Sequence, residues 1–124
     1  MTDFYKLSVE LSNTAKEIQL KDGLVEAARL SYLTAKADHE RALAKALIET
    51  KLRNPEMTQT DIKAEAVVLT YDAKIAAIIA ESAYKKLVGE LKALRDKIEA
   101  LREVSFNLRC EAKLTPQMQG GNNA

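Results

Sequence analysis

The stretch ETKLRNPEMTQTD, Glu49–Asp61, decides the fold, because it interrupts a chain whose composition otherwise favours helix throughout. Pro55 lacks a backbone N–H and pushes Asn54 out of helical geometry, so a helix is expected to end here. The hydroxyl of Thr58 or of Thr60 can then cap the free N–H groups of a second helix. The stretch therefore predicts a turn that joins two antiparallel helices.

Ahead of the turn, the sequence predicts one helix from about residue 3 to residue 53. Its apolar residues recur at intervals of three and four, which is the spacing of one helical face. Ser, Asn and Gly are weak residues in a helix interior, so the segment Leu11–Thr14 and Gly23 leave two outcomes open, a continuous helix and one kinked or split near its start. The apolar stripe contains Leu7, Leu11, Ile18, Val25, Ala28, Tyr32, Ala35, His39, Ala42 and Ala46.

After the turn, a second helix is expected from about residue 61 to residue 113, ended by Thr115 and Pro116. We therefore expect a single helical domain over residues 1–114, with the turn at 54–60 and a disordered polar tail at 115–124. The second half of this helix has a heptad pattern, which is typical of coiled coils. Its apolar positions are Leu87, Leu91, Leu94, Ile98, Leu101, Ser105 and Leu108.

Two glycines lie at matching distances from the turn. A hairpin centred near residue 56 places Gly23 and Gly89 nearly opposite each other. They could permit a close approach of the two backbones, mark a pair of flexible points, or have no relation to each other.

The segment Ala66–Ala80 is apolar nearly all round, since only Thr70, Asp72 and Lys74 interrupt it. A helix that is apolar on every side must be covered on every side, and one hairpin partner covers only one of them. We therefore expect an all-α, coiled-coil-like antiparallel hairpin that forms a homo-oligomer, with a helix of another protein as the alternative cover. The predicted oligomer interface is Val68, Tyr71, Ile75, Ile78 and Ile79.

Composition and motifs indicate no enzyme. Cys110 and His39 are the only residues of their types, so neither a disulfide within the chain nor a zinc site is expected. The sequence also lacks a glycine-rich phosphate loop. We expect no catalytic residue, no metal and no cofactor.

The first residues do not form a signal peptide, and Ala66–Ala80 is too short and too polar to cross a bilayer. A cytoplasmic protein without a membrane partner is therefore expected.

Charge is nearly balanced, with 19 Lys and Arg against 18 Asp and Glu, so binding to a polyanion requires local clusters. A solvated surface with ion pairs is the simpler interpretation of such clusters, but an oligomer repeats a modest patch several times. The first candidate cluster flanks the turn, and the second lies along the second half of the second helix. They consist of Lys45, Lys51, Arg53 and Lys63, and of Lys92, Arg95, Arg102 and Arg109.

The second helix, IKAEAVVLTYDAKIAAIIAESAYKKLVGELKALRDKIEALREVSFNLRCEAK, resembles the C-terminal half of the UvsY-type recombination mediators of phages. The shared features are a Lys before an aliphatic run, a DAK triplet, a long heptad segment, Asp96–Ile98 and the aromatic Phe106. The segment RALAKALIETKLRN resembles the basic strip before that family's central break. The likeness extends from Ala28 to Lys113.

The resemblance implies an oligomeric helical protein in the cytoplasm of the host cell that binds single-stranded DNA. It also implies that the protein helps a RecA-like recombinase to replace the single-strand-binding protein. The family attributes DNA contact to a Lys-x-Arg pair; Lys45 matches the Lys, but Leu47 stands in place of the Arg. Lys51 and Arg53 could take over that contact.

Two further functions stay open from the residues alone. A structural coiled-coil adaptor that binds only proteins agrees with the near-neutral charge and with the scattered tyrosines. A nuclease inhibitor that mimics duplex DNA is disfavoured, because such a mimic should be strongly acidic.

Overall fold

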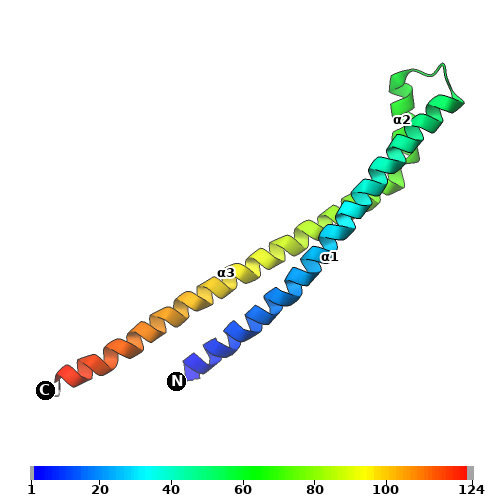
Figure 1. The fold of residues 1–124 in the computed structure, drawn as a ribbon. Coiled ribbons are helices and arrows are strands. Elements are labelled where there is room, and N and C mark those ends of the chain that lie inside the picture. Colours follow the sequence, from blue (N-terminus) through cyan, green and yellow to red (C-terminus); the bar gives the residue numbers. More distant parts are fainter. Residues whose placement is uncertain (1, 123–124) are drawn as a thin grey trace. The chain divides into compact units, whose positions relative to one another are not determined.

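The structure is a computed structural model that describes the backbone of residues 2–122 and the side chains of residues 3–113. This part of the chain consists of three α-helices without a strand: α1 (Thr2–Arg53), α2 (Gln59–Leu69) and α3 (Tyr71–Asn122). Helices α1 and α3 pack against each other in opposite directions (Figure 1). The predicted all-α helical hairpin is therefore confirmed.

The turn forms where Pro55 predicted it. The backbone N–H of Asn54 donates to the Thr50 carbonyl at 3.0 Å and closes α1, and the N–H of Met57 donates to the Asn54 carbonyl at 3.1 Å. Of the two candidate caps, Thr58 is the one used, because its Oγ1 accepts from the Asp61 N–H at 3.3 Å. Helix α2 consequently starts at Gln59, inside the predicted turn of residues 54–60.

The predicted single helix after the turn is wrong in one respect, because Thr70 divides it into α2 and α3. The Thr70 Oγ1 donates a hydrogen bond to the Ala66 carbonyl at 2.8 Å, a contact that bends helices. Its φ of −106° and ψ of 16° depart from helical values, yet the Lys74 N–H still donates to the Thr70 carbonyl at 3.0 Å. The break is thus local, and main-chain hydrogen bonding continues on both sides of it.

The other helix ends also differ from expectation. Helix α1 is continuous through Ser12–Thr14 and through Gly23, so a split near its start is not observed. Thr14 is buried against the rest of the hairpin, and this packing outweighs its weak helix propensity. Helix α3 runs to Asn122 rather than to about residue 113. The tail that was expected to be disordered is therefore helical as far as Asn122, and residues 123–124 lie outside the described part.

The chain divides into two compact units, each of which contains parts of both long helices. The terminal unit comprises Met1–Gly23 and Gly89–Ala124, and the tip unit comprises Leu24–Val88. This division does not test the expectation of one domain over residues 1–114, which stays a prediction.

In the terminal unit, side chains spaced by three and four residues form the core. Ion pairs flank this core, with the Lys21 Nζ at 2.8 Å from the Glu90 Oε2. The predicted stripe and heptad residues of this unit are buried or half-buried, which confirms both patterns. The most buried side chains are Leu7, Thr14, Leu91, Ile98 and Ser105.

In the tip unit, small residues fill much of the core, because α1 faces α2 and the start of α3 through alanines and threonines. Farther from the turn, Tyr32 and Tyr84 stack with their ring centroids 6.1 Å apart. His39 is half-buried on the same stripe, as expected for a packed histidine. The most buried side chains are Ala46, Thr50, Ile62, Ala66 and Thr70.

The boundary between the two units falls at Gly23 and Gly89. A Cβ atom added at either glycine would meet nothing within 4 Å. A close backbone approach is therefore not the reason for these glycines, and both have φ values that any residue can adopt.

We predict that Gly23→Ala and Gly89→Ala each raise the free energy of unfolding, by about 0.5–1 kcal/mol, because Ala loses less chain entropy in a helix. Urea denaturation followed by circular dichroism measures the change. A loss of stability in either variant would contradict the open surroundings of these residues.

The Thr50 hydroxyl is buried and has no hydrogen-bond partner among the described residues. We predict that Thr50→Val stabilises the protein by about 1 kcal/mol, because it removes a polar group that is dehydrated without compensation. Thermal unfolding measures the effect, and Thr34→Val on the exposed side of α1 controls for helix propensity. An equal gain in both variants would show that the burial of Thr50 is not the cause.

Candidate functional site

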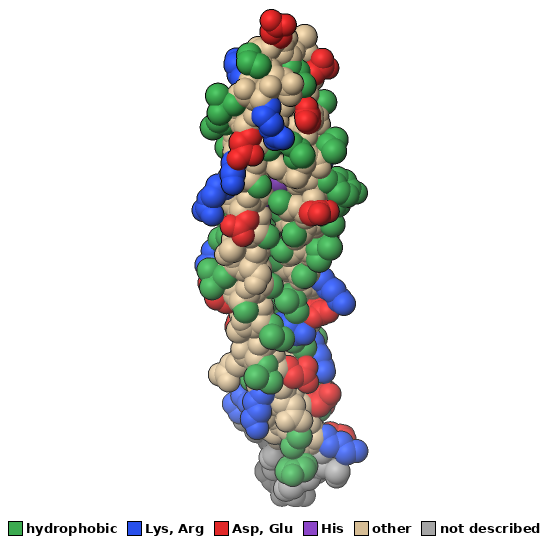
Figure 2. Space-filling view, turned by 90° about the vertical axis from the view of Figure 1, so that its right-hand side faces the viewer, with side chains coloured by type: hydrophobic (Ala, Val, Ile, Leu, Met, Phe, Trp, Pro, Cys, Tyr) green, Lys and Arg blue, Asp and Glu red, His purple; other side chains and the backbone are tan. Residues whose placement is uncertain are grey.

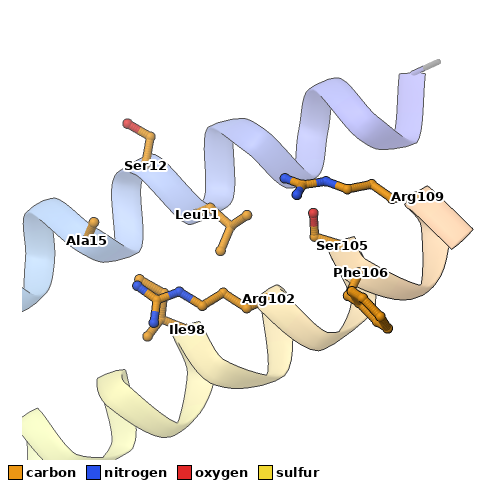
Figure 3. Close-up of a pocket in the computed structure, with 8 residues that line it drawn as sticks. All are labelled: Leu11, Ser12, Ala15, Ile98, Arg102, Ser105, Phe106 and Arg109. Atoms are coloured by element: carbon orange, nitrogen blue, oxygen red, sulfur yellow. The ribbon is translucent and has the colours of Figure 1, made fainter.

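A groove runs between α1 and α3 in the terminal unit and contains two residues of the second predicted basic cluster, Arg102 and Arg109. We call it the arginine groove; its cavity is about 570 Å³. Figure 3 shows Arg102 and Arg109 extending from α3 along the space between the two helices. Its lining is Leu11, Ser12 and Ala15 from α1, with Ile98, Arg102, Ser105, Phe106 and Arg109 from α3.

The arginines of α3 follow a seven-residue spacing, so Arg95, Arg102 and Arg109 lie along one edge of the helix. Only the first has an acidic partner across the hairpin, since its Nη2 lies 3.2 Å from the Asp22 Oδ1. Seven residues before Asp22 on α1 stands Ala15, which lines the groove beside Arg102. The next equivalent position toward the N-terminus is a serine. The edge of α1 thus lacks a carboxylate where the second and third arginines need one.

A smaller pocket of about 340 Å³ continues the groove toward Arg95 and shares Ala15, Ile98 and Arg102 with it. Glu99 is the only acidic residue that lines either pocket. Among the described residues, neither Arg102 nor Arg109 forms an ion pair. Two guanidinium groups are therefore available to an anion.

An exposed aromatic ring lies between these two arginines in the sequence. The Phe106 side chain is 64% exposed, and Figure 3 shows its ring pointing away from α1 at the outer edge of the groove. Proteins that bind single-stranded nucleic acids combine positive charge with exposed aromatic rings, because every base has a face that can stack on such a ring. Phe106 beside the two guanidinium groups is a combination of this kind.

On the opposite edge of the same helices, two lysines form ion pairs across the hairpin. The Lys97 Nζ lies 3.9 Å from the Glu10 Oε1, and Lys21 pairs with Glu90. Lys97 and Lys21 are therefore neutralised across the hairpin, whereas Arg102 and Arg109 form no ion pair among the described residues. Lys92, which the sequence grouped with the arginines, lines neither pocket.

The four basic residues predicted around the turn do not form one cluster. Lys45 lies 3.9 Å from Glu49 on the same helix. Lys51 and Lys63 line a shared groove, whereas Arg53 lines a different pocket with the residues of the turn. Leu47, which stands where the resembling family has an Arg, lines the groove of the two lysines.

The predicted oligomer interface lies on the side of α2 and α3 that faces away from α1. Val68 is 73% exposed and Ile79 is 63% exposed, and Tyr71 and Ile78 are exposed as well. Only Ile75 is half-buried. Figure 2 shows exposed hydrophobic side chains among the charged ones along one face of the molecule.

Several other charged groups are occupied by near neighbours on the same helix. Hydrogen bonds from Arg29 lower the pKa of Glu26, with a smaller Coulombic contribution in the same direction. A hydrogen bond to Glu81 raises the pKa of Lys85. Such exposed pairs contribute little to stability, but they remove these cations from the set that can bind a ligand.

The sequence alone does not indicate that Ser12, Ala15 and Ser105 line a groove, and Phe106 enters the sequence analysis only as part of a resemblance. One signal was present, since Asp22 and Ala15 stand seven residues apart and the arginines repeat at the same interval. It becomes informative only when the register of the hairpin is known.

The described residues contain no group of His, Cys, Asp and Glu that could hold a metal ion. Within that same part of the chain, no helix has a stretch long and apolar enough to cross a membrane. Comparison with family models, with curated proteins and with solved structures finds no match to this chain. The resemblance to the phage mediators therefore stays a prediction.

Proposed function

We propose that this protein is a non-catalytic accessory protein of DNA recombination that binds single-stranded DNA through the arginine groove. One observation carries the proposal: Arg102 and Arg109 lie on one edge of α3 beside the exposed ring of Phe106, and neither pairs with an acidic residue in the described part of the chain. This site replaces the turn as the first candidate, because the basic residues of the turn are divided among an ion pair and two pockets.

The groove would bind a strand by charge and by stacking, without breaking a bond. The two guanidinium groups would each bind backbone phosphates, which positions the strand without selecting a sequence. Their Cα atoms are separated by about 10.5 Å along the helix, given a rise of about 1.5 Å per residue. A base stacked on Phe106 between these contacts would keep the strand extended, in a form that another protein can load onto.

Two parts of the proposal rest on the resemblance to the phage mediators. These are the loading of a RecA-like recombinase and the displacement of a single-strand-binding protein. The arginine groove supports DNA binding in general and does not by itself select these two protein partners.

We predict that changing both Arg102 and Arg109 to Ala weakens binding to a thymidine oligonucleotide and flattens its salt dependence. Each lost phosphate contact lowers the slope of log K against log salt by roughly 0.7, so the double change lowers it by roughly 1.4 per chain. Ala15→Glu should weaken binding in the same way, because it supplies the carboxylate that Arg102 lacks. Fluorescence anisotropy at several salt concentrations measures both effects.

The matched control changes Lys36 and Lys86 to Ala, which removes the same charge from exposed positions outside the grooves. A second comparison changes Lys51 and Arg53 to Ala beside the turn. If the turn variant loses binding and the groove variant does not, DNA binds at the turn. If neither variant differs from the control, the proposal of DNA binding fails.

A structural adaptor that assembles through helices is the second candidate, and the apolar outer face of α2 and α3 favours it. Val68, Tyr71, Ile75 and Ile78 follow a heptad spacing on the side opposite to α1. A second heptad seam that continues from α2 into α3 is expected to pack against a further helix. Further copies of this chain would cover it and would also multiply the arginine groove.

We predict that the wild-type protein is an oligomer at micromolar concentration and that changing both Val68 and Ile79 to Gln shifts it to a lower mass with its helicity retained. Both side chains are exposed, so the change should not disturb the packing between α1 and α3. Sedimentation velocity measures the mass, and Val9 and Val104 changed to Gln form the matched control. A monomeric wild type would contradict assembly through this face.

A further inference from the structure

The groove of the two lysines lies in the tip unit, and its chemistry differs from that of the arginine groove. We call it the tip groove; its cavity is about 400 Å³. Helix α1 forms one wall and the first turn of α2 forms the other. The lining consists of Leu47, Ile48, Lys51, Leu52, Gln59, Ile62 and Lys63.

The floor and walls of the tip groove are aliphatic. Ile62 is 3% exposed and Leu47 is half-buried, whereas Ile48 is 63% exposed and Leu52 is 75% exposed. Leaving two large aliphatic side chains this open to water is unfavourable, by about 25 cal/mol for each Å² of apolar surface. A ligand that fits the groove must therefore offer apolar surface of its own.

The charge on the groove has one sign. Lys51 on α1 and Lys63 on α2 both line it, none of its seven lining residues is acidic, and neither lysine forms an ion pair among the described residues. Acidic residues do occur on the same segments, such as Glu49 and Asp61, but they do not line the groove. The complementary ligand is thus anionic at two points and aliphatic between them.

A nucleic acid fits this description poorly. Its strand would place phosphates near the lysines, but the groove has no aromatic ring on which a base could stack. A peptide helix fits well, because leucine-like residues at intervals of three and four form one apolar face that enters a groove between helices. Acidic residues on the two borders of that face would reach the lysines.

We infer that the tip groove binds an amphipathic helix of a partner protein, one whose apolar face is bordered by Asp or Glu. The inference is independent of the DNA-binding proposal, because the two grooves share no residue. It assigns Lys51 and Lys63 to the recognition of a protein rather than of phosphates.

The experiment uses the full-length protein and two fluorescently labelled peptides of three heptads. The acidic peptide has Leu on one face and Glu at the positions that border it, and the basic peptide has Lys in place of each Glu. Fluorescence anisotropy should show binding of the acidic peptide at least tenfold tighter than that of the basic one. Equal affinities, or no saturable binding of either peptide, would overturn the inference.

Charge reversal then locates the contact. Changing both Lys51 and Lys63 to Glu should abolish binding of the acidic peptide and confer binding of the basic one, since the apolar groove is unchanged. The control changes Lys36 and Lys86 to Glu, alters net charge equally and should leave the preference intact. If the control variant behaves as the groove variant does, the effect is one of net charge and the inference fails.

Two further readouts exclude other occupants. Ile48→Ser with Leu52→Ser should weaken the acidic peptide at least tenfold at unchanged helicity, because both side chains are exposed. If the same variant lowers the sedimenting mass, a second copy of the chain occupies the groove and the inference is wrong. A thymidine oligonucleotide should not displace the peptide; displacement would show that the tip groove binds nucleic acid.

Discussion

The register of the hairpin is the constraint on which the other features depend. Pro55 ends α1, Thr58 starts α2, and the turn between them fixes which residues face each other. In the terminal unit this register sets Arg95 against Asp22, and in the tip unit it stacks Tyr32 on Tyr84. The same register leaves small residues opposite the remaining arginines. A hairpin shifted by one heptad would bury the same stripes but would redistribute the charges along their edges.

Periodicity in the sequence predicts most of the fold, because burial of an apolar stripe dominates the stability of long helices. Every predicted stripe residue, from Leu7 to Ala46, is buried or half-buried. The break at Thr70 could not be predicted in this way, since it depends on whether a hydroxyl bonds to the carbonyl four residues earlier. The continuity of α1 through Ser12–Thr14 shows the reverse case, in which tertiary packing outweighs local propensity.

The candidate site could be predicted only in part. The sequence shows where basic residues concentrate, but it does not show which of them the chain neutralises. Lys45 is paired on its own helix and Arg95 is paired across the hairpin, whereas Arg102 and Arg109 have no ion-pair partner among residues 3–113. The sequence also gives no indication that Lys51 and Lys63 border an aliphatic groove, because its walls come from two helices. Both the ion pairing of the basic residues and the shape of the grooves depend on the register of the hairpin. The turn, which is far from these residues in the sequence, sets this register.

We propose two ligands for two surfaces, a single strand of DNA for the arginine groove and a protein helix for the tip groove. Photocrosslinking tests this division directly, with p-benzoylphenylalanine placed at Phe106 or at Leu52, both of which are exposed. Each labelled protein is irradiated with a thymidine oligonucleotide. We predict a DNA adduct from position 106 and none from position 52. Any adduct from position 52, or the lack of one from position 106, would contradict this division.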